Sequence, residues 1–339
     1  MTLALIQTVF RFAWRLIRTA TGRAAAVLLG GGILLLAQSA EKAAQKDLTP
    51  VRFAFSSQMF TDVNENDARA SVKAWALALA RERGVPMSTE PIVLSGTTQL
   101  REFLCDASID GAAVTTEEYL SLEPELQGTN MFVSFIGGQY TEVYLMLVRV
   151  DSGITDLGGL RGRKITLFEN PRMSLAPLWL DLTLSEQGLG PPARHFGQVV
   201  RAQKLPKVVL PVFFRQQDAC IVTRRGFETM CELNPQVRAQ LRVLVTSPAV
   251  VPAVGFLRRG YDSPLRDMML NALRGLEKSA AGEQVLTLFQ SDQLQEVSAT
   301  LLGSARDLVE AHRRLNLTGV VETNLPVAAA ANLELRRAP

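Results

Sequence analysis

The sequence DSGITDLGGLRGRKI, residues 151–165, decides how the chain folds, because it joins two segments that read as buried strands. The strand predicted before it spans residues 142–148, and the strand predicted after it spans residues 164–168. Between them, four glycines and two aspartates favour turns, since glycine adopts backbone conformations that other residues avoid. A helix predicted over residues 174–187 follows the second strand. Strand, tight connection, strand and helix in this order are typical of an α/β protein.

The same alternation extends to both sides of this stretch. Upstream, strands are predicted over 51–55, 91–95 and 110–115, and helices over 67–83 and 97–107. Downstream, strands are predicted over 219–222, 241–245 and 254–257, and helices over 205–215, 224–233, 264–276, 282–290 and 305–315. Strands that alternate with helices form parallel sheets covered on both faces, so we expect an α/β fold with mainly parallel sheets.

The charge balance and the residue counts exclude several classes of partner and cofactor. The 339 residues carry 36 Lys and Arg against 33 Asp and Glu, a formal net charge of +3. Four of the arginines lie in the first 40 residues, which contain no acidic residue, so the rest of the chain is close to neutral. Nucleic-acid binding needs a basic stripe, so we expect no nucleic-acid partner. Two His and three Cys are few for a zinc site with four ligands, so we expect no metal and no other cofactor.

The N-terminal segment reads as an export signal. Residues 1–23 are apolar and basic, and residues 24–40 are uncharged and rich in Ala, Leu and Gly. These features, with small residues that fit cleavage after Ser39, are typical of a secretory signal. The alternative is an uncleaved inner-membrane anchor, although the run is shorter than the ~20 residues that a membrane helix needs. We therefore expect a periplasmic protein, and we expect residues 318–339 to form a loose C-terminal tail.

Export raises the question of whether the cysteines form a disulfide, because disulfides form in oxidising compartments. Cys220 lies in a predicted strand and Cys231 near the end of a predicted helix. The two form either a bridge or a pair of buried thiols. Cys105, in the predicted helix over 97–107, is expected in the core.

The sequence lacks the motifs of common enzyme classes. It contains no GxxxxGK[ST] phosphate loop, no GxGxxG dinucleotide fingerprint and no GxSxG nucleophile turn. His195 stands alone in a proline-rich loop, where we expect it at the surface. Glu117 and Glu118 are adjacent in sequence, a spacing that rarely places two carboxylates in one site. We therefore expect a binding protein without catalytic residues.

The stretch 151–165 resembles the DSGIxxLxDLKGKxI turn of periplasmic solute-binding proteins of ABC transporters, most of all those of the phosphonate- and phosphite-binding branch. Three further segments resemble that branch in the same order: residues 114–120, 218–230 followed by 233–235, and 282–290. The resemblance covers about residues 51–300. It implies the type II periplasmic binding fold, in which two α/β lobes joined by two crossover segments hold a ligand between them. Lobe one would comprise residues 51–147 plus 250–315, and lobe two residues 148–249.

The positions just after the predicted strands are the candidate ligand contacts. Ligands of open α/β sheets lie beyond the carboxyl ends of strands and in clefts between domains. The candidates are Ser57, Gln58, Met59, Phe60, Thr115, Glu118, Tyr119, Asn170, Arg172, Ser174, Lys204 and Thr223. Some also have a purely structural interpretation. Glu117 and Glu118 suit the first turn of a helix, Phe60 and Tyr119 suit the core, and Lys204 suits a solvated face.

One loop departs from the pattern of the phosphonate binders. Their strand here at 164–168 is followed by a Ser/Thr-rich loop whose hydroxyls and backbone N–H groups face the anion. This chain has NPRMSL at 170–175 instead, with Ser174 as the one remaining hydroxyl. The guanidinium of Arg172 would be able to replace the lost donors.

Three functions stay open at this point. In the first, the exported protein closes its lobes on a phosphonate-like oxyanion and delivers it to an inner-membrane transporter. Arg172, Ser174 and Lys204 would hold that anion. A further alternative is that the chain is a membrane-tethered sensor or interaction domain. We expect the protein to be a monomer.

The remaining alternative is that the protein binds and transports an amphipathic, lipid- or sterol-like ligand. Its apolar wall would consist of Met59, Phe60, Met173 and Leu175. Its polar head would bond to Glu118, Tyr119 and Asn170.

Overall fold

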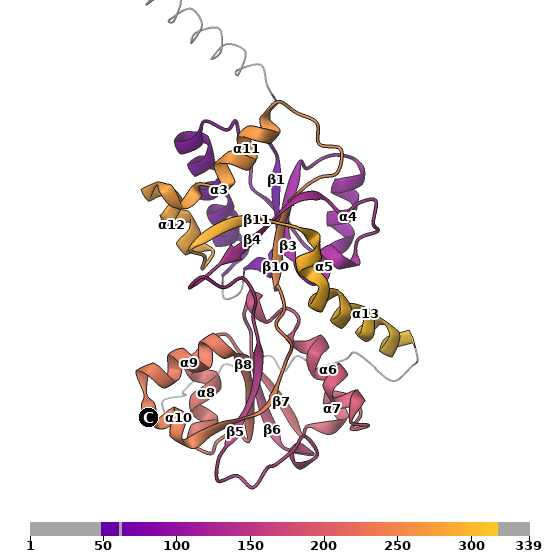
Figure 1. Cartoon of the computed structure of the whole chain (residues 1–339), viewed down its shortest axis with the longest axis vertical. Coiled ribbons are helices and arrows are strands. Elements are labelled where there is room, and N and C mark those ends of the chain that lie inside the picture. Colours follow the sequence, from indigo (N-terminus) through magenta and orange to yellow (C-terminus); the bar gives the residue numbers. More distant parts are fainter. Residues whose placement is uncertain (1–48, 61–62, 318–339) are drawn as a thin grey trace, which may run out of the picture. The chain divides into compact units, whose positions relative to one another are not determined.

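Two β-sheets, each lying between helices, make up the fold (Figure 1). The computed structural model describes residues 49–60 and 63–317. The first sheet has the order β11 (Gln293–Val297), β4 (Thr129–Phe135), β10 (Ala253–Leu257), β3 (Gly111–Thr115), β1 (Phe53–Ser56), β2 (Ile92–Leu94). The second has the order β7 (Gln198–Ala202), β6 (Lys164–Phe168), β8 (Ala219–Thr223), β5 (Tyr144–Arg149), β9 (Leu241–Thr246). The expected fold class, a two-lobed α/β protein, is confirmed.

Both sheets are mixed, whereas the sequence predicts mainly parallel ones. β1 runs parallel to β2 and β3, and β6 runs parallel to β7 and β8. β10, however, is antiparallel to β3 and β4, and β5 is antiparallel to β8 and β9. The chain enters β5 and β10 directly after crossing from the other sheet. No crossover helix precedes these strands within their own sheet, so nothing imposes the parallel direction on them.

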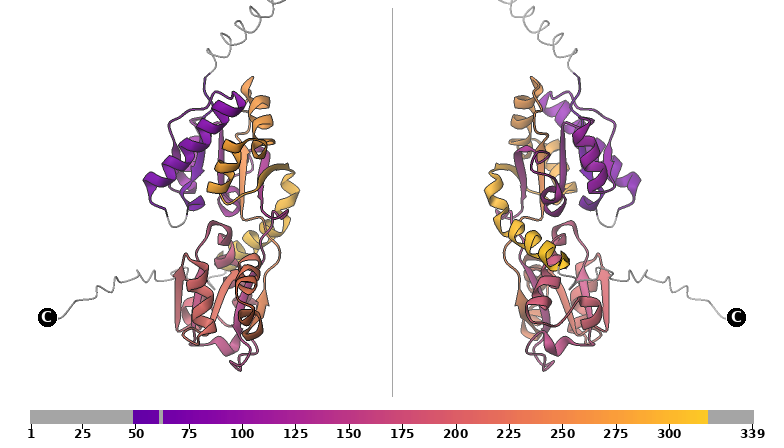
Figure 2. Two further views of the ribbon diagram at one scale, coloured as in Figure 1. Left: turned by 90° about the vertical axis from the view of Figure 1, so that its left-hand side faces the viewer. Right: turned by 90° about the vertical axis from the view of Figure 1, so that its right-hand side faces the viewer.

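Helices cover both faces of each sheet (Figures 1 and 2). On the first sheet, one face carries α3 (Glu65–Arg83), α11 (Leu265–Leu273) and α12 (Ala280–Leu288), and the other carries α4 (Thr97–Cys105) and α5 (Thr116–Ser121). On the second sheet, one face carries α8 (Leu205–Phe213), α9 (Arg224–Leu233) and α10 (Pro235–Gln240), and the other carries α6 (Ala176–Glu186) and α7 (Pro192–His195). Both faces of each sheet are therefore covered by helices, as in other α/β proteins.

Helix α3 shows how local sequence sets an element. Its N-cap is Asn64, whose side chain accepts a hydrogen bond from the Asp67 backbone N–H at 3.0 Å. Its C-cap is Gly84, with a φ of +67° that favours glycine. Between the caps, Trp75 and Leu79 are buried, as their helical spacing predicts.

Two crossover segments join the sheets. Residues 136–143 lead from β4 to β5, and residues 247–252 lead from β9 to β10. They pair where the Glu142 N–H donates to the Val250 carbonyl at 2.8 Å and the Val250 N–H donates to the Glu142 carbonyl at 2.9 Å. From Val51 onward, the described residues form one compact unit.

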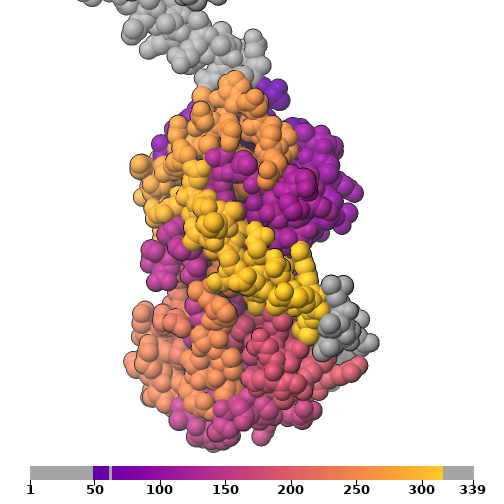
Figure 3. All heavy atoms as spheres, turned by 45° about the vertical axis from the view of Figure 1, so that its right-hand side comes forward, coloured from indigo at the N-terminus to yellow at the C-terminus, as the bar shows by residue number. Residues whose placement is uncertain are grey.

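Helix α13 (Gly303–Leu317) makes a third connection, since it packs against both α5 and α6 (Figure 3). Nε2 of His312 lies 3.0 Å from Oδ2 of Asp181 on α6. The Arg313 side chain donates to the carbonyl of Leu120 on α5 at 2.9 Å. Helix α13 is thus fixed to helices that cover different sheets.

The sequence pattern does not predict β4, β7 and β11. β7 and β11 are edge strands, and none of their residues is fully buried. An edge strand that buries little apolar surface shows no clear alternation. β4 buries only its three central residues, so its pattern is short as well.

Two expectations about burial are wrong, and the structure decides whether Cys220 and Cys231 are bridged. Cys105 is exposed at the end of α4. His195 is buried, because the turn at 151–165 packs over it: Nε2 lies 2.8 Å from the Leu157 carbonyl. Cys220 and Cys231 are free, buried thiols, so no bridge joins them. The export signal at 1–40 and the tail at 318–339 lie outside the described residues.

Candidate functional site

A cleft of about 250 Å³ is lined by residues of the first sheet and its connections and by the loop that follows β6 of the second sheet. On the side of the first sheet it is bounded by Met59 and Phe60 after β1, by Ser134 of β4 and by residues 288–290 at the end of α12. On the side of the second sheet it is bounded by residues 170–172, which follow β6. The crossover segments contribute Tyr140 and Pro252. A cleft at strand ends between two domains is the usual place for a small ligand in such folds.

Among the residues that the structure describes, Arg172 is the one charged residue that lines this cleft. Its Nη1 lies 2.9 Å from Oε1 of Glu142, and the side chains are 15% and 3% exposed. Its Nη2 donates to Ser134 Oγ at 3.3 Å and to the Gln290 carbonyl at 3.1 Å. Burial lowers the pKa of the Arg172 guanidinium, and the charge of Glu142 opposes that change. The guanidinium therefore stays charged, but a carboxylate already compensates its charge.

The loop that carries Arg172 is held by its own hydrogen bonds. Asn170 caps the short helix η3 (Pro171–Met173) by accepting from the Arg172 backbone N–H at 3.0 Å. Ser174 Oγ donates to the carbonyl of Pro252 in the second crossover at 2.9 Å. Met173 and Leu175 are 4% and 0% exposed and pack in the core. The expected apolar wall therefore loses these two residues, while Asn170 and Arg172 do reach the cleft.

The structure places Glu118 in a capping box at the start of α5. Its Oε2 accepts from the Thr115 N–H at 2.9 Å and from Thr115 Oγ1 at 3.0 Å. Its Oε1 accepts from Ser56 Oγ at 2.7 Å, which links the ends of β1 and β3. Tyr119 is buried against Phe256, with ring centroids 5.0 Å apart, and its hydroxyl donates to the Gly128 carbonyl. These side chains do not line the cleft.

The remaining candidates divide between exposed positions and the cleft. Ser57 and Gln58 are exposed in the short helix η1 (Ser57–Met59), and Lys204 is exposed before α8. Thr223 Oγ1 caps α9 by accepting from the Gly226 N–H at 3.1 Å. Met59 and Phe60 line the cleft. Of the twelve candidates, the structure brings together Met59, Phe60, Asn170 and Arg172.

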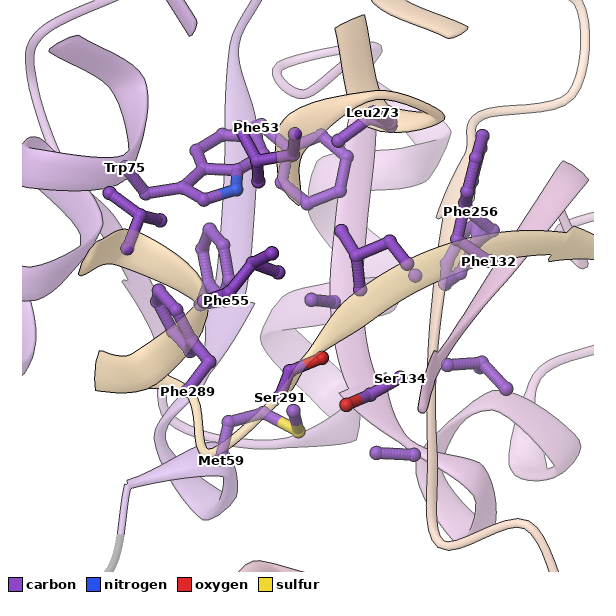
Figure 4. A pocket seen from close by; sticks show the side chains of 18 of the residues that line it. Phe53, Phe55, Met59, Trp75, Phe132, Ser134, Phe256, Leu273, Phe289 and Ser291 are labelled. Atoms are coloured by element: carbon purple, nitrogen blue, oxygen red, sulfur yellow. The ribbon is translucent and has the colours of Figure 1, made fainter. Parts of the chain in front are cut away.

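A second pocket of about 100 Å³ lies between the first sheet and the helices α3, α11 and α12 (Figure 4). Its walls are apolar except for the hydroxyls of Ser134 and Ser291. Met59, Ser134, Ala253 and Phe289 line this pocket and the cleft, so the two spaces are neighbours. We call it the apolar pocket.

Sequence reasoning misses several residues of the two spaces. Ser134 and Tyr140 follow no predicted strand, because β4 itself is not predicted. Phe289 and Gln290 stand in the segment 282–290, and their signal was the resemblance of that segment to the solute-binding proteins. Trp75 lies on the apolar stripe of a predicted helix, where a core role and a pocket role look the same in sequence.

Neither a membrane span nor a metal site is found in the part of the chain that the structure describes. There, no helix is both long enough and apolar enough to cross a bilayer. In the same residues, no three His, Cys, Asp or Glu side chains gather as metal ligands.

Comparisons with known proteins place the chain in a family. The model of the family described as ABC transporter, phosphonate, periplasmic substrate-binding protein matches residues 58–302. No protein with a curated description matches the chain in sequence. A solved structure of XAC2383 from Xanthomonas citri bound to ATP is 18% identical, with a TM-score of 0.59 over 81% of this chain and 100% of its own.

Two further structures are similar. A binding-protein component of an ABC phosphonate transporter from Pseudomonas aeruginosa is 15% identical, with a TM-score of 0.54 over 83% of this chain and 91% of its own. PhnD1 from Prochlorococcus marinus, in complex with methylphosphonate, is 15% identical, with a TM-score of 0.53 over 78% of this chain and 98% of its own. Similarity at these identities shows a common fold. The family match includes the turn at 151–165 and every residue described above as lining the cleft, so the resemblance inferred from the sequence is confirmed: the chain belongs to the periplasmic substrate-binding proteins of phosphonate ABC transporters.

Proposed function

We propose that this protein binds a small solute in the cleft and delivers it, chemically unchanged, to an ABC transporter of the inner membrane. The observation that carries the proposal is that one cleft is lined by Ser134 of the first sheet and by Asn170 and Arg172 of the loop that follows β6 in the second sheet. A ligand that touches both halves binds the closed arrangement more tightly than the open one. Binding therefore favours closure by hinge motion at the crossovers.

The proposed organisation follows the two sheets. Residues 51–147 and 250–315 would form one lobe, and residues 148–249 the other. The segment 1–40 would direct export, with cleavage after Ser39, and the protein would act in the periplasm as a monomer. No catalysis is proposed, because the described residues that line the cleft include no Asp, Glu, His, Lys or Cys to serve as an acid, a base or a thiol nucleophile.

The polar end of the solute would carry one negative charge or none. Arg172 is the single cation among the described residues of the cleft lining, and Glu142 already compensates its charge. A dianion there would meet the Glu142 carboxylate as well as the guanidinium, and like charges repel. Lys204 is exposed and the Ser174 hydroxyl is bonded to Pro252, so the oxyanion hypothesis rests on Arg172 and on the uncharged donors around it.

Calorimetric titration of the purified protein with methylphosphonate and with inorganic phosphate tests the proposal. We expect methylphosphonate to bind, and we expect Arg172→Met to weaken binding at least tenfold, because the charged donor is lost. Arg172→Lys, which keeps the charge but not the planar fork, should lose less. Arg101→Met, at an exposed ion pair on α4, is the matched control.

Two results would overturn the proposal. Equal affinity in the wild type and in Arg172→Met would place the ligand elsewhere. An unchanged radius of gyration in small-angle scattering at saturating ligand would contradict closure.

A further inference from the structure

We propose that the apolar pocket receives a hydrocarbon substituent of the same solute, so that the transported molecule is a small polar or singly charged head on an alkyl or aryl chain. This rests on the proposed function, since it concerns the solute bound in the cleft.

The hollow comes from two small residues at the centre of the first sheet. Strand pairing places Phe55, Ala113, Gly255 and Phe132 in one row across β1, β3, β10 and β4. Paired residues in a sheet point to the same face, so two positions with little or no side chain stand between two phenylalanines. Although β3 and β10 are central strands, Ala113 and Gly255 are only partly buried. The helices above this row therefore do not fill the space over them.

The walls of the hollow are aromatic. Trp75 of α3 packs against Phe53 and Phe55, with ring centroids 4.8 and 5.1 Å apart, and Phe289 stacks on Phe55 at 5.1 Å (Figure 4). Protein interiors are normally packed without voids of this size, and an apolar void that stays dry binds apolar molecules. Ser291 Oγ donates to the Gln293 carbonyl at 3.0 Å, so its hydroxyl does not call for a polar ligand.

The hollow adjoins the cleft at Met59 and Phe289, which line both spaces. The ring centroids of Phe289 and Phe60 are also 5.9 Å apart, and Phe60 lines the cleft. Leu288 and Val63, both at the cleft, are 57% and 47% exposed, so they offer apolar surface beside the junction. Met59 is flexible and adapts its shape to a neighbouring group. A hydrocarbon chain of a solute bound in the cleft would therefore contact apolar side chains along its whole way into the pocket.

The two ends of the path differ in chemistry. Ser134 stands at the boundary, and its hydroxyl accepts from Arg172, so the polar network of the cleft ends where the pocket begins. A head group would find hydrogen-bond donors at Arg172, and a hydrocarbon would find apolar contacts over Ala113 and Gly255. A bare oxyanion would leave the pocket empty.

Titration with a homologous series tests the inference. The probes are methyl-, butyl- and octylphosphonate, together with butanol and octanol as neutral probes that need no anion site. We expect affinity to rise about fourfold per added methylene until the pocket is filled, in both series, because each buried methylene adds a similar transfer free energy. Quenching or shift of Trp75 fluorescence should accompany binding of the longer members.

The blocking variant is Gly255→Leu. A Cβ at this position meets its nearest heavy atoms, the Ala112 carbonyl oxygen and Phe132 Cβ, at 3.9 Å, so the strand tolerates a side chain. We expect this variant to bind methylphosphonate like the wild type and to lose the dependence on chain length. Gly303→Leu, at an exposed position with no heavy atom within 4 Å of the added Cβ, is the matched control.

The outcomes separate the two proposals. Methylphosphonate binding with affinity that is flat along the series would overturn the inference and leave the proposed function standing. Chain-length dependence that persists in Gly255→Leu would also overturn it. Alkanol binding that rises with length and is lost in Gly255→Leu, without any phosphonate binding, would support the pocket and contradict the oxyanion head. If neither series showed a dependence on length, the inference would be wrong.

Discussion

Arg172 and Glu142 form a buried ion pair, with Nη1 2.9 Å from Oε1, that joins the loop after β6 to the first crossover. The same guanidinium donates to Ser134 of the first sheet and to the Gln290 carbonyl after α12. One side chain of the second half is thus bonded to the hinge and to the first half. The same guanidinium is the proposed ligand contact, and the first of the following expectations starts from these bonds.

Glu142→Gln should raise the affinity for methylphosphonate about tenfold and lower the free energy of unfolding by about 3 kcal/mol. The affinity rises because the anion no longer meets a carboxylate, and stability falls because a buried cation loses its counter-charge. Calorimetry and urea unfolding measure the two effects. Glu123→Gln, at the exposed pair with Arg101, should change neither. Weaker binding in Glu142→Gln would show that the carboxylate positions Arg172 more than it opposes the anion.

Glu118→Ala should lower the free energy of unfolding by about 3 kcal/mol without changing ligand affinity. The substitution leaves the Ser56 hydroxyl and the Thr115 N–H and hydroxyl without their acceptor in a buried place. Urea unfolding and calorimetry on the folded fraction separate the two readouts. The exposed Glu125→Ala is the control. A large loss of affinity with unchanged stability would return Glu118 to the ligand contacts.

The stability of the protein should depend on pH through Glu117. Burial raises the pKa of its carboxyl, His312 and Arg313 of α13 oppose this change, and Glu118 adds to it. The folded protein then holds the proton more tightly than the unfolded chain. The resulting stability is present at low pH and is lost as pH rises through the raised pKa.

Glu117→Gln, which has no proton to lose, should therefore be more stable than the wild type at about pH 7 and should gain less at about pH 4. Unfolding at both values, taken as the difference between variant and wild type, cancels the other titrating groups. A variant that loses stability at neutral pH would contradict the direction of the shift.

The three cysteines should react with iodoacetamide at different rates. Cys105 is exposed, whereas Cys220 and Cys231 are buried, and burial raises the pKa of both of their thiols. Mass spectrometry of the native protein should show one fast adduct, on Cys105. Unfolding without reductant should add the other two. Failure of the last two to react before reduction would mean that Cys220 and Cys231 are bridged.

Much of the fold could be predicted because most strands and helices carry strong patterns. The stripe with Val72, Trp75 and Leu79 and the turn at 151–165 are where the sequence predicts them. Strand direction could not be predicted, because it depends on which sheet the chain has just left. The edge strands β7 and β11 bury too little surface to leave a pattern.

The candidate site was harder to predict for a physical reason. Strand ends supply both ligand contacts and helix caps, and the same residue types suit both roles. Thr115, Glu118 and Thr223 satisfy backbone donors at helix starts, while Asn170 caps a short helix and also reaches the cleft. The hollow over Ala113 and Gly255 leaves no motif at all, since it consists of missing side chains at positions far apart in sequence.

Helix α13 bears on how the two halves can separate. Among the described residues, this helix adds a third connection to the two crossovers, and it is fixed at both α5 and α6 through Arg313 and His312. Three attachments restrict twisting and sliding far more than two, so the remaining freedom approaches swinging about a single line. Any opening that admits a solute must then either follow that line or peel the helix from one of its two supports.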